Sequence, residues 1–158
     1  MNLEPSLSKT ALLPKPLVSR ALAIAFLTIA FLGFLDATYL AVEHFRGVIP
    51  PCTIIEGCEK VTTSEYSVIL GVPVALLGSI YYFLVIVLSI LFFDRKNEKY
   101  FLYASYLTIF GLLAAIYFVF IQLVIIKAIC IYCMFSALTS TLLFILGLLV
   151  VLKSRRSV

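Results

Sequence analysis

The sequence predicts an all-α integral membrane protein, built as a four-transmembrane-helix bundle with a cysteine-bearing extracytoplasmic loop between the first and second helices. Of its 158 residues, 63% are hydrophobic, which is more than a soluble domain of this length can bury. The apolar residues gather in four runs, each at least as long as the roughly 20 residues that a helix needs to span a bilayer. Strict alternation of polar and apolar residues is absent, which argues against a lipid-facing β-barrel.

The chain is expected to form one four-helix domain over residues 20–152, between an N-terminal tail (1–19) and a short basic tail (153–158). The first tail is polar and interrupted by prolines. It shows no short apolar core followed by a small-residue cleavage site, so we do not interpret it as a secretory signal. The four predicted spans are 21–42, 72–93, 100–126 and 128–152.

Lysine and arginine predict the orientation. Nine of these residues lie before the first span, in the loop 94–99 or after the fourth span, whereas the other side has only Arg46, Lys60 and Lys127. Because positively charged loops are retained in the cytoplasm, both termini are expected there, in a multi-pass protein of the cell (inner) membrane. The net charge of +4 is therefore explained by the membrane topology. We expect the protein to be surrounded by membrane lipid and to have no nucleic-acid partner.

The four cysteines occur as two pairs on the same side of the membrane. Cys52 and Cys58 follow the first predicted span, and Cys130 and Cys133 begin the fourth. Each pair is reached after an odd number of crossings, so all four thiols face the periplasmic or other extracytoplasmic side. That side is the oxidising one in bacteria.

Three interpretations of these cysteines are open. Structural disulfides could fix the loop, although such bridges seldom use the CxxC spacing. Four cysteines could bind zinc, but the gap between Cys52 and Cys58 is longer than the usual ligand spacing, and we expect no metal site. Dithiol–disulfide chemistry is favoured, because CxxC places both sulfurs on one helix face and a helix N-terminus stabilises the reactive thiolate. The alternative is a non-enzymatic membrane scaffold or metal-handling protein.

The order of the motifs resembles the vitamin K epoxide reductase family over roughly residues 20–152. The matching features are Cys52 and Cys58, then Ser64, then "GVPVALLG" (71–78), then the CxxC that opens the fourth helix. This resemblance implies a bundle around a quinone of the menaquinone, ubiquinone or phylloquinone type. The implied function is a quinone-dependent thiol–disulfide oxidoreductase that oxidises a thioredoxin-like partner and supports disulfide formation in exported proteins.

The resemblance also implies roles for single residues. Cys133 corresponds to the cysteine beside the quinone ring, and Cys130 to the one that exchanges with the loop. Cys58 corresponds to the loop cysteine that meets Cys130, and Cys52 to the one that the partner attacks. Ser64 corresponds to a serine that supports the site by hydrogen bonding, whereas the sequence alone favours an ordinary loop or helix-cap serine.

The chain departs from the animal members of that family at two positions. They have an asparagine and a tyrosine in contact with the quinone, where this chain has Val74 and Ala137. We therefore expect quinone reduction of the bacterial type and little epoxide reduction. Asp36 and Gln122 are polar residues inside predicted spans, which makes them further candidates for quinone binding. Since the sequence ends at Val158, the thioredoxin-fold partner is expected to be a separate protein.

Overall fold

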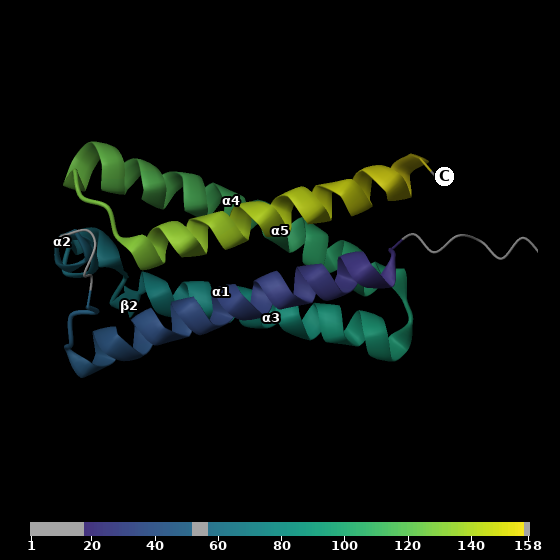
Figure 1. Ribbon diagram of the computed structural model, residues 1–158, viewed down its shortest axis with the longest axis horizontal. Helices are drawn as coiled ribbons and strands as arrows, with labels where there is room; N and C mark the ends of the chain where they lie inside the picture. Colours follow the sequence, from purple (N-terminus) through teal and green to yellow (C-terminus); the bar gives the residue numbers. More distant parts are fainter. Residues whose placement is uncertain (1–17, 52–56, 157–158) are drawn as a thin grey trace, which may run out of the picture.

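Four long helices form the protein. The computed structural model describes residues 18–51 and 57–156, and Figure 1 shows the helices side by side in that part of the chain. Each is long and apolar enough to cross a membrane, which confirms the predicted fold class. The helices are α1 (Arg20–Arg46), α3 (Val74–Arg95), α4 (Glu98–Phe120) and α5 (Ile131–Arg156).

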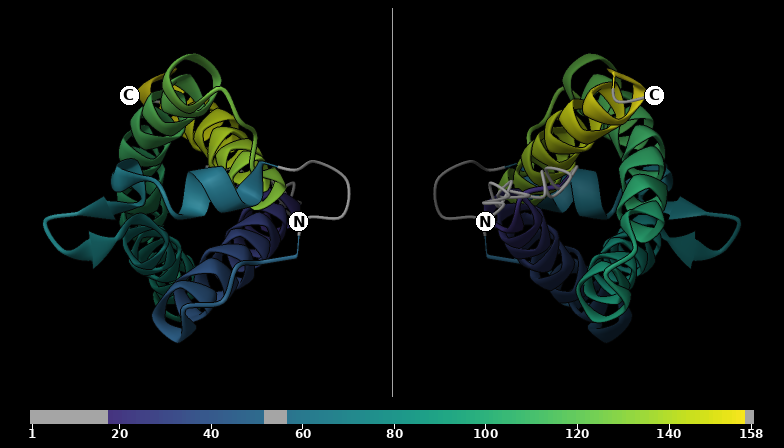
Figure 2. Two further views of the ribbon diagram at one scale, coloured as in Figure 1. Left: turned by 90° about the vertical axis from the view of Figure 1, so that its left-hand side faces the viewer. Right: turned by 90° about the vertical axis from the view of Figure 1, so that its right-hand side faces the viewer.

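The helices form a closed ring. Helix α1 packs against α3 and α5, and α4 packs against the same two helices, so that the end-on views in Figure 2 show a diamond. The start of α1, the α3–α4 turn and the end of α5 lie at one end of the bundle (Figure 1). Cys58, which begins α2, and the α4–α5 connection that contains Cys130 lie at the other end.

Local sequence signals set the helix ends. The Ser19 hydroxyl accepts a hydrogen bond from the Leu22 N–H (3.3 Å), and α1 stops at Gly47, whose φ of 66° suits a residue without Cβ. Helix α3 stops at Lys96 (φ 50°), and the Asn97 side chain accepts a hydrogen bond from the Lys99 N–H (3.0 Å) at the start of α4. These caps satisfy backbone groups that helix ends leave unpaired.

The end of the bundle away from the cysteines is tightly packed. The ring of Phe101, fully buried, lies 4.8 Å from that of Phe26 and 5.3 Å from that of Phe92, measured between centroids. Alanines such as Ala30 and Ala104 allow the helices to approach closely here. Large apolar side chains cover the outside, as expected of a surface in contact with lipid: among them are Phe31, Leu84, Phe110 and Leu149.

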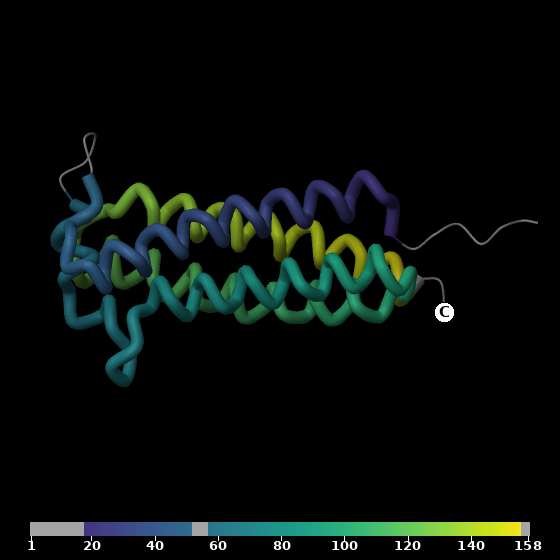
Figure 3. The backbone as a smooth tube through the Cα atoms, turned by 90° about the horizontal axis from the view of Figure 1, so that it is seen from below, coloured from purple at the N-terminus to yellow at the C-terminus, as the bar shows by residue number. Residues whose placement is uncertain are grey.

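Short elements cover the cysteine end. Helix α2 (Cys58–Thr62) lies across the mouth of the bundle in the left view of Figure 2, and the 3₁₀ turn η1 (Glu65–Ser67) follows it. Strands β1 (Val68–Ile69) and β2 (Val72–Pro73) then form an antiparallel hairpin that projects sideways in Figure 3. The first two residues of the predicted span 72–93 therefore belong to this hairpin, and α3 starts after them.

The connection between α4 and α5 is irregular. Helix α4 continues as the π-helical segment η2 (Ile121–Ile126), which ends at Lys127 in the left-handed conformation (φ 53°). Residues 127–130 are not helical, and α5 begins at Ile131. Cys130 is therefore the last residue before α5, and Cys133 lies in its first turn.

Gly33 lies at a close contact between α1 and α3. A Cβ at Gly33 would overlap the Tyr82 ring, whereas a Cβ at Gly78 would lie 3.6 Å from the Ala37 Cβ, an ordinary contact. Tyr82 cannot move away easily, because its hydroxyl donates a hydrogen bond to the Ser136 carbonyl (2.7 Å). We predict that Gly33→Ala lowers the free energy of unfolding by about 1–3 kcal/mol, measured by denaturation in detergent.

The matched control for that prediction is Gly78→Ala, which introduces the same methyl group into a helix of the same bundle. It should change the unfolding free energy much less. Equal losses in the two variants would show that the contact between Gly33 and Tyr82 does not limit the packing of α1 on α3.

Candidate functional site

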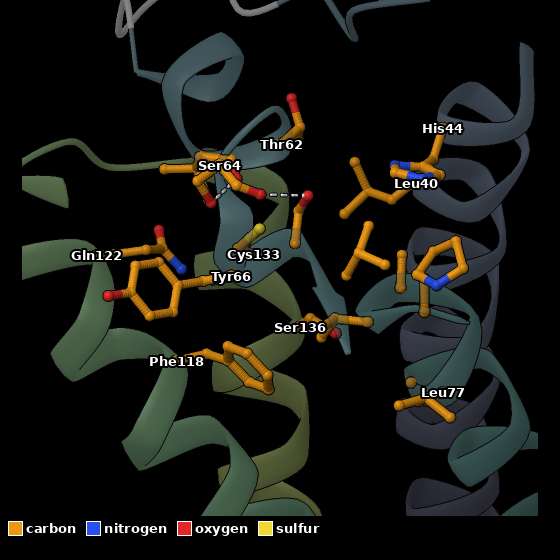
Figure 4. A pocket seen from close by; sticks show the side chains of 18 of the residues that line it. Leu40, His44, Thr62, Ser64, Tyr66, Leu77, Phe118, Gln122, Cys133 and Ser136 are labelled. Carbon is orange, nitrogen blue, oxygen red and sulfur yellow. Dashed lines mark hydrogen bonds between the residues drawn. The ribbon is translucent and has the colours of Figure 1, made fainter. Parts of the chain in front are cut away.

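A cavity of about 790 Å³ lies between the four helices at the cysteine end. Helix α2 and η1 cover it from outside, and Figure 4 shows Thr62, Ser64 and Tyr66 of this cover around the opening. The walls are mainly apolar and include Leu77 and Phe118. Size and lining are typical of a site for a small, largely apolar molecule.

The cavity brings together several residues that the sequence analysis selected. Five of these candidates line it: Ser64, Val74, Gln122, Cys133 and Ala137. Cys58 and Cys130 lie beside it, in a buried cluster against which Cys133 packs. Asp36 is half-buried and is not part of the lining. Cys52 lies outside the described residues, so its predicted role stays a prediction.

The described cysteines differ in redox state. Cys58 is disulfide-bonded, whereas Cys130 and Cys133 are free thiols. Cys58 and Cys130 are almost fully buried, with 1% and 0% of their surfaces exposed, and share their cluster with Val61. Cys133 is less buried and reaches the cavity (Figure 4). The CxxC pair thus borders the loop cysteine on one side and the cavity on the other.

Gly57 allows the loop and the CxxC segment to meet. A Cβ at this position would overlap the carbonyl oxygen of Ile129. A larger residue would therefore push the start of α2 away from the segment just before α5. The glycine holds Cys58, the next residue, close to the backbone that carries Cys130.

Gln122 fixes the position of Cys130. Its Oε1 accepts a hydrogen bond from the Cys130 N–H (3.0 Å), and its backbone carbonyl accepts one from the Ala128 N–H (3.1 Å). The Cys130 carbonyl in turn accepts a hydrogen bond from the Met134 N–H (3.0 Å), which is a backbone hydrogen bond in the first turn of α5. Gln122, only 3% exposed, therefore connects the end of η2 to the start of α5, while its amide nitrogen points toward the cavity in Figure 4.

The environment of Cys130 favours its thiolate. The pKa of this thiol falls from the ordinary 9.0 to about 7, chiefly because the Cys133 thiol donates a hydrogen bond to it. Burial opposes this decrease, the backbone N–H groups of Cys133 and Tyr132 add to it, and the charge of Asp36 opposes it weakly. Thiolate stabilisation by N–H groups at a helix start is the effect that the CxxC position predicted.

Ser64 organises the cover of the cavity. Its hydroxyl donates to the Val61 carbonyl (2.7 Å), and its own carbonyl accepts hydrogen bonds from the N–H (2.9 Å) and the hydroxyl (2.7 Å) of Ser67. The residue therefore joins α2 to η1 above the site. Its predicted hydrogen bonding to the reacting groups stays a prediction.

Two serines of the cavity were missed by the sequence analysis. Ser136 and Ser140 lie on the same face of α5 as Cys133 and line the cavity with it. Their separations of three and seven residues from Cys133 are those of one helix face. That spacing was the available signal, but two serines in an apolar run also fit ordinary helix packing.

The titration of Cys130 tests the site electrostatics. In the wild type with Cys130 and Cys133 reduced, thiolate should form around pH 7. In Cys133→Ala the hydrogen bond that stabilises this thiolate is lost, so the pKa of Cys130 should rise toward its ordinary value. The ultraviolet absorbance of the thiolate measures both titrations, and a Cys130→Ala control should lose the step near pH 7. An unchanged midpoint in Cys133→Ala would contradict the assigned cause.

Comparison with known proteins identifies a family for the part of the chain that forms the cavity. No individual curated protein matches the chain. The model of the vitamin K epoxide reductase family matches residues 24–148, which include most of α1 and α5 and all of α2, α3 and α4. The matched segment contains all four cysteines and the whole lining of the cavity. The chain therefore belongs to the vitamin K epoxide reductase family.

Proposed function

We propose that this membrane thiol–disulfide oxidoreductase passes two electrons from a thioredoxin-like partner, through Cys52/Cys58 and Cys130/Cys133, to a quinone. The observation that carries the proposal is the placement of the CxxC pair. Cys130 is buried with Cys58, and Cys133 borders the cavity. A pair in that position can accept electrons on the loop side and release them on the cavity side.

The relay consists of disulfide exchanges in which one bond forms for each that breaks. The partner's dithiol is oxidised, and the Cys52–Cys58 disulfide is reduced. The Cys58 thiolate then attacks Cys130 in the Cys130–Cys133 disulfide, forming a Cys58–Cys130 bond and releasing the Cys133 thiolate. Attack by Cys52 on Cys58 re-forms the loop disulfide and releases Cys130. The product state has Cys58 bonded and both CxxC thiols free, as in the structure.

The lowered pKa of Cys130 supports this direction. In the last exchange Cys130 is the leaving group, and a thiol of lower pKa leaves faster. With a pKa of about 7, Cys130 is a better leaving group at neutral pH than an ordinary cysteine. The hydrogen bond from Cys133 and the N–H groups at the start of α5 therefore assist the step that returns the loop to its oxidised form.

The cavity fits a quinone head group. Its volume of about 790 Å³ and its apolar walls suit an aromatic ring with part of an isoprenoid chain. When bound, a quinone would supply the electron acceptor: the Cys130/Cys133 dithiol would return to its disulfide and give up two electrons and two protons. The chain's own contribution is to hold Cys133 at the wall of the cavity, to keep the ring away from the buried Cys58, and to cover the mouth with α2 and η1.

The proposed orientation places the thiols on the extracytoplasmic side. The positively charged loops lie at the opposite end of the bundle, which favours that end for the cytoplasm. A separate thioredoxin-fold protein would then deliver electrons from exported proteins as these form disulfides. Attack by this partner at Cys52 leaves Cys58 as the thiolate next to Cys130, which is why we assign Cys52 to the partner.

Alanine variants of the four cysteines test the relay. Each should reduce quinone-dependent oxidation of a reduced thioredoxin-fold donor to background, because each thiol has a separate step. Ser89→Ala, which removes a buried hydroxyl outside the cavity, should retain activity. Full turnover by Cys52→Ala or Cys133→Ala would rule out the relay.

Thiol trapping separates the relay from the non-enzymatic alternatives. Wild-type cysteines should shift between reduced and oxidised forms as quinone is added or withdrawn. Structural disulfides would stay oxidised under both conditions. A zinc site would stay reduced and would become reactive to alkylation only after treatment with a chelator.

The lining of the cavity also predicts substrate preference. Val74 and Ala137 present no polar group to a ligand, although both line the cavity. Opening of an epoxide requires donation of a proton to its oxygen, so the epoxide of vitamin K should be a poor substrate relative to the corresponding quinone. Initial rates with one dithiol donor measure the preference. Comparable rates would show that polar groups at these two positions are not required.

A further inference from the structure

Two buried hydroxyls beside the cavity, Tyr81 Oη and Ser140 Oγ, make no well-formed hydrogen bond among the described residues, although they lie close enough to interact with each other. Both residues line the cavity, and Ser140 is only 4% exposed. In a membrane-embedded site few water molecules are available to satisfy such groups, so an unpaired hydroxyl is unfavourable unless a ligand binds it.

Other buried hydroxyls of the bundle show that such pairing is available. Ser89, Ser105 and Thr108 each donate to a backbone carbonyl within their own helix, at 2.6–2.8 Å. Tyr82, the neighbour of Tyr81, donates to the Ser136 carbonyl and lies 2.8 Å from the Thr139 hydroxyl. The two unpaired hydroxyls are therefore not a general feature of this helix packing.

The two hydroxyls come from different helices and face the same space. Tyr81 belongs to α3 and Ser140 to α5. A Cβ added to Gly111 of α4 would overlap both hydroxyl oxygens. Gly111 thus leaves room for the pair. A hydrogen bond between the two hydroxyls would use only one of their two protons, so the other would still need an acceptor.

Tyr81 and Ser140 lie farther along their helices from the cysteine end than Val74 and Ala137, the positions at which the family resemblance implies polar contacts. Tyr81 follows Val74 by seven residues, and Ser140 follows Ala137 by three, so each lies on the same helix face as the apolar residue. Ser140 is seven residues from Cys133 along α5, which corresponds to about 10 Å at 1.5 Å per residue. That separation leaves space for a ring between the sulfur and the hydroxyls.

We propose that Tyr81 and Ser140 form the hydrogen-bonding site for a carbonyl oxygen of the bound quinone, replacing the polar contacts that Val74 and Ala137 cannot make. This inference rests on the proposed function. The cavity offers apolar walls for the ring and, at this point, two hydroxyl donors for one acceptor. A quinone carbonyl has the required chemistry, since it accepts hydrogen bonds and carries no proton of its own.

Binding of a dimethylnaphthoquinone tests the proposal. This probe has no free ring position for addition of a thiol, and it is added to the full-length protein in detergent with the cysteines oxidised. Tyr81→Phe and Ser140→Ala should each weaken binding about three- to tenfold, the loss expected for one hydrogen bond. Tyr103→Phe and Ser105→Ala are matched controls outside the cavity and should bind as the wild type does.

Infrared difference spectra give a readout that does not depend on turnover. With isotope-labelled carbonyls, the bound quinone should show one carbonyl stretch lowered by hydrogen bonding. In the Tyr81→Phe/Ser140→Ala double variant this band should return toward the frequency of the free quinone. Thermal melts of all variants identify any loss of binding that comes from unfolding.

The outcomes separate this inference from the proposed function. Weaker binding together with the carbonyl shift, in folded variants, supports the hydroxyl pair. Unchanged affinity and an unchanged carbonyl band in a wild type that reduces quinone would overturn the pair and leave the relay intact. A wild type that neither binds nor reduces the quinone would overturn both.

Discussion

The hydrogen bond from the Cys130 N–H to Gln122 Oε1 holds together the part of the molecule where the reacting groups lie. The chain leaves α4 through a π-helical segment, reverses direction and starts α5 within a few residues. Such a reversal leaves buried N–H groups without helical partners. Gln122 satisfies the one on Cys130. The position of the CxxC pair between Cys58 and the cavity depends on this connection.

Polar side chains in the bundle interior also need hydrogen-bond partners. A membrane offers no water to an unpaired donor, so most buried hydroxyls of the described helices bond to a carbonyl one turn earlier. Toward the packed end, Ser89, Ser105 and Thr108 all make such bonds. The exceptions among the described residues are Tyr81 and Ser140, which line the cavity, and Asp36, which does not. Two of the three unsatisfied side chains therefore belong to the cavity wall.

The sequence predicted the helices well because span length and apolar content are strong signals. It also placed Cys58 and the CxxC pair at one end, since parity of crossings requires no knowledge of packing. The π-helical end of α4 could not be predicted, because hydropathy does not distinguish one helical hydrogen-bond pattern from another. Gln122 was recognised as a candidate for quinone binding, but its bond to Cys130 depends on how two helices meet in space.

The residues that line the cavity were also only partly predictable from the sequence. Val74 and Ala137 were selected by resemblance, and both line the cavity. Ser140 could have been identified from the sequence only by its spacing from Cys133. That spacing does not reveal whether the hydroxyl is hydrogen-bonded within the helix. Thr141, the next residue, donates to the Ala137 carbonyl (2.7 Å). Only the three-dimensional arrangement separates the satisfied hydroxyl from the unsatisfied one.

The spacing of the CxxC pair gives a physical reason why the proposed relay uses two cysteines at the start of α5. Cys130 is buried against Cys58 and does not line the cavity, whereas Cys133 lines it. One thiol could not reach both surfaces without moving the start of the helix, which Gln122 holds in place. Two thiols three residues apart at the start of α5 can form and break a disulfide while the backbone stays fixed. In the proposed relay, electron transfer across this segment would then require a change of bonding and little change of structure.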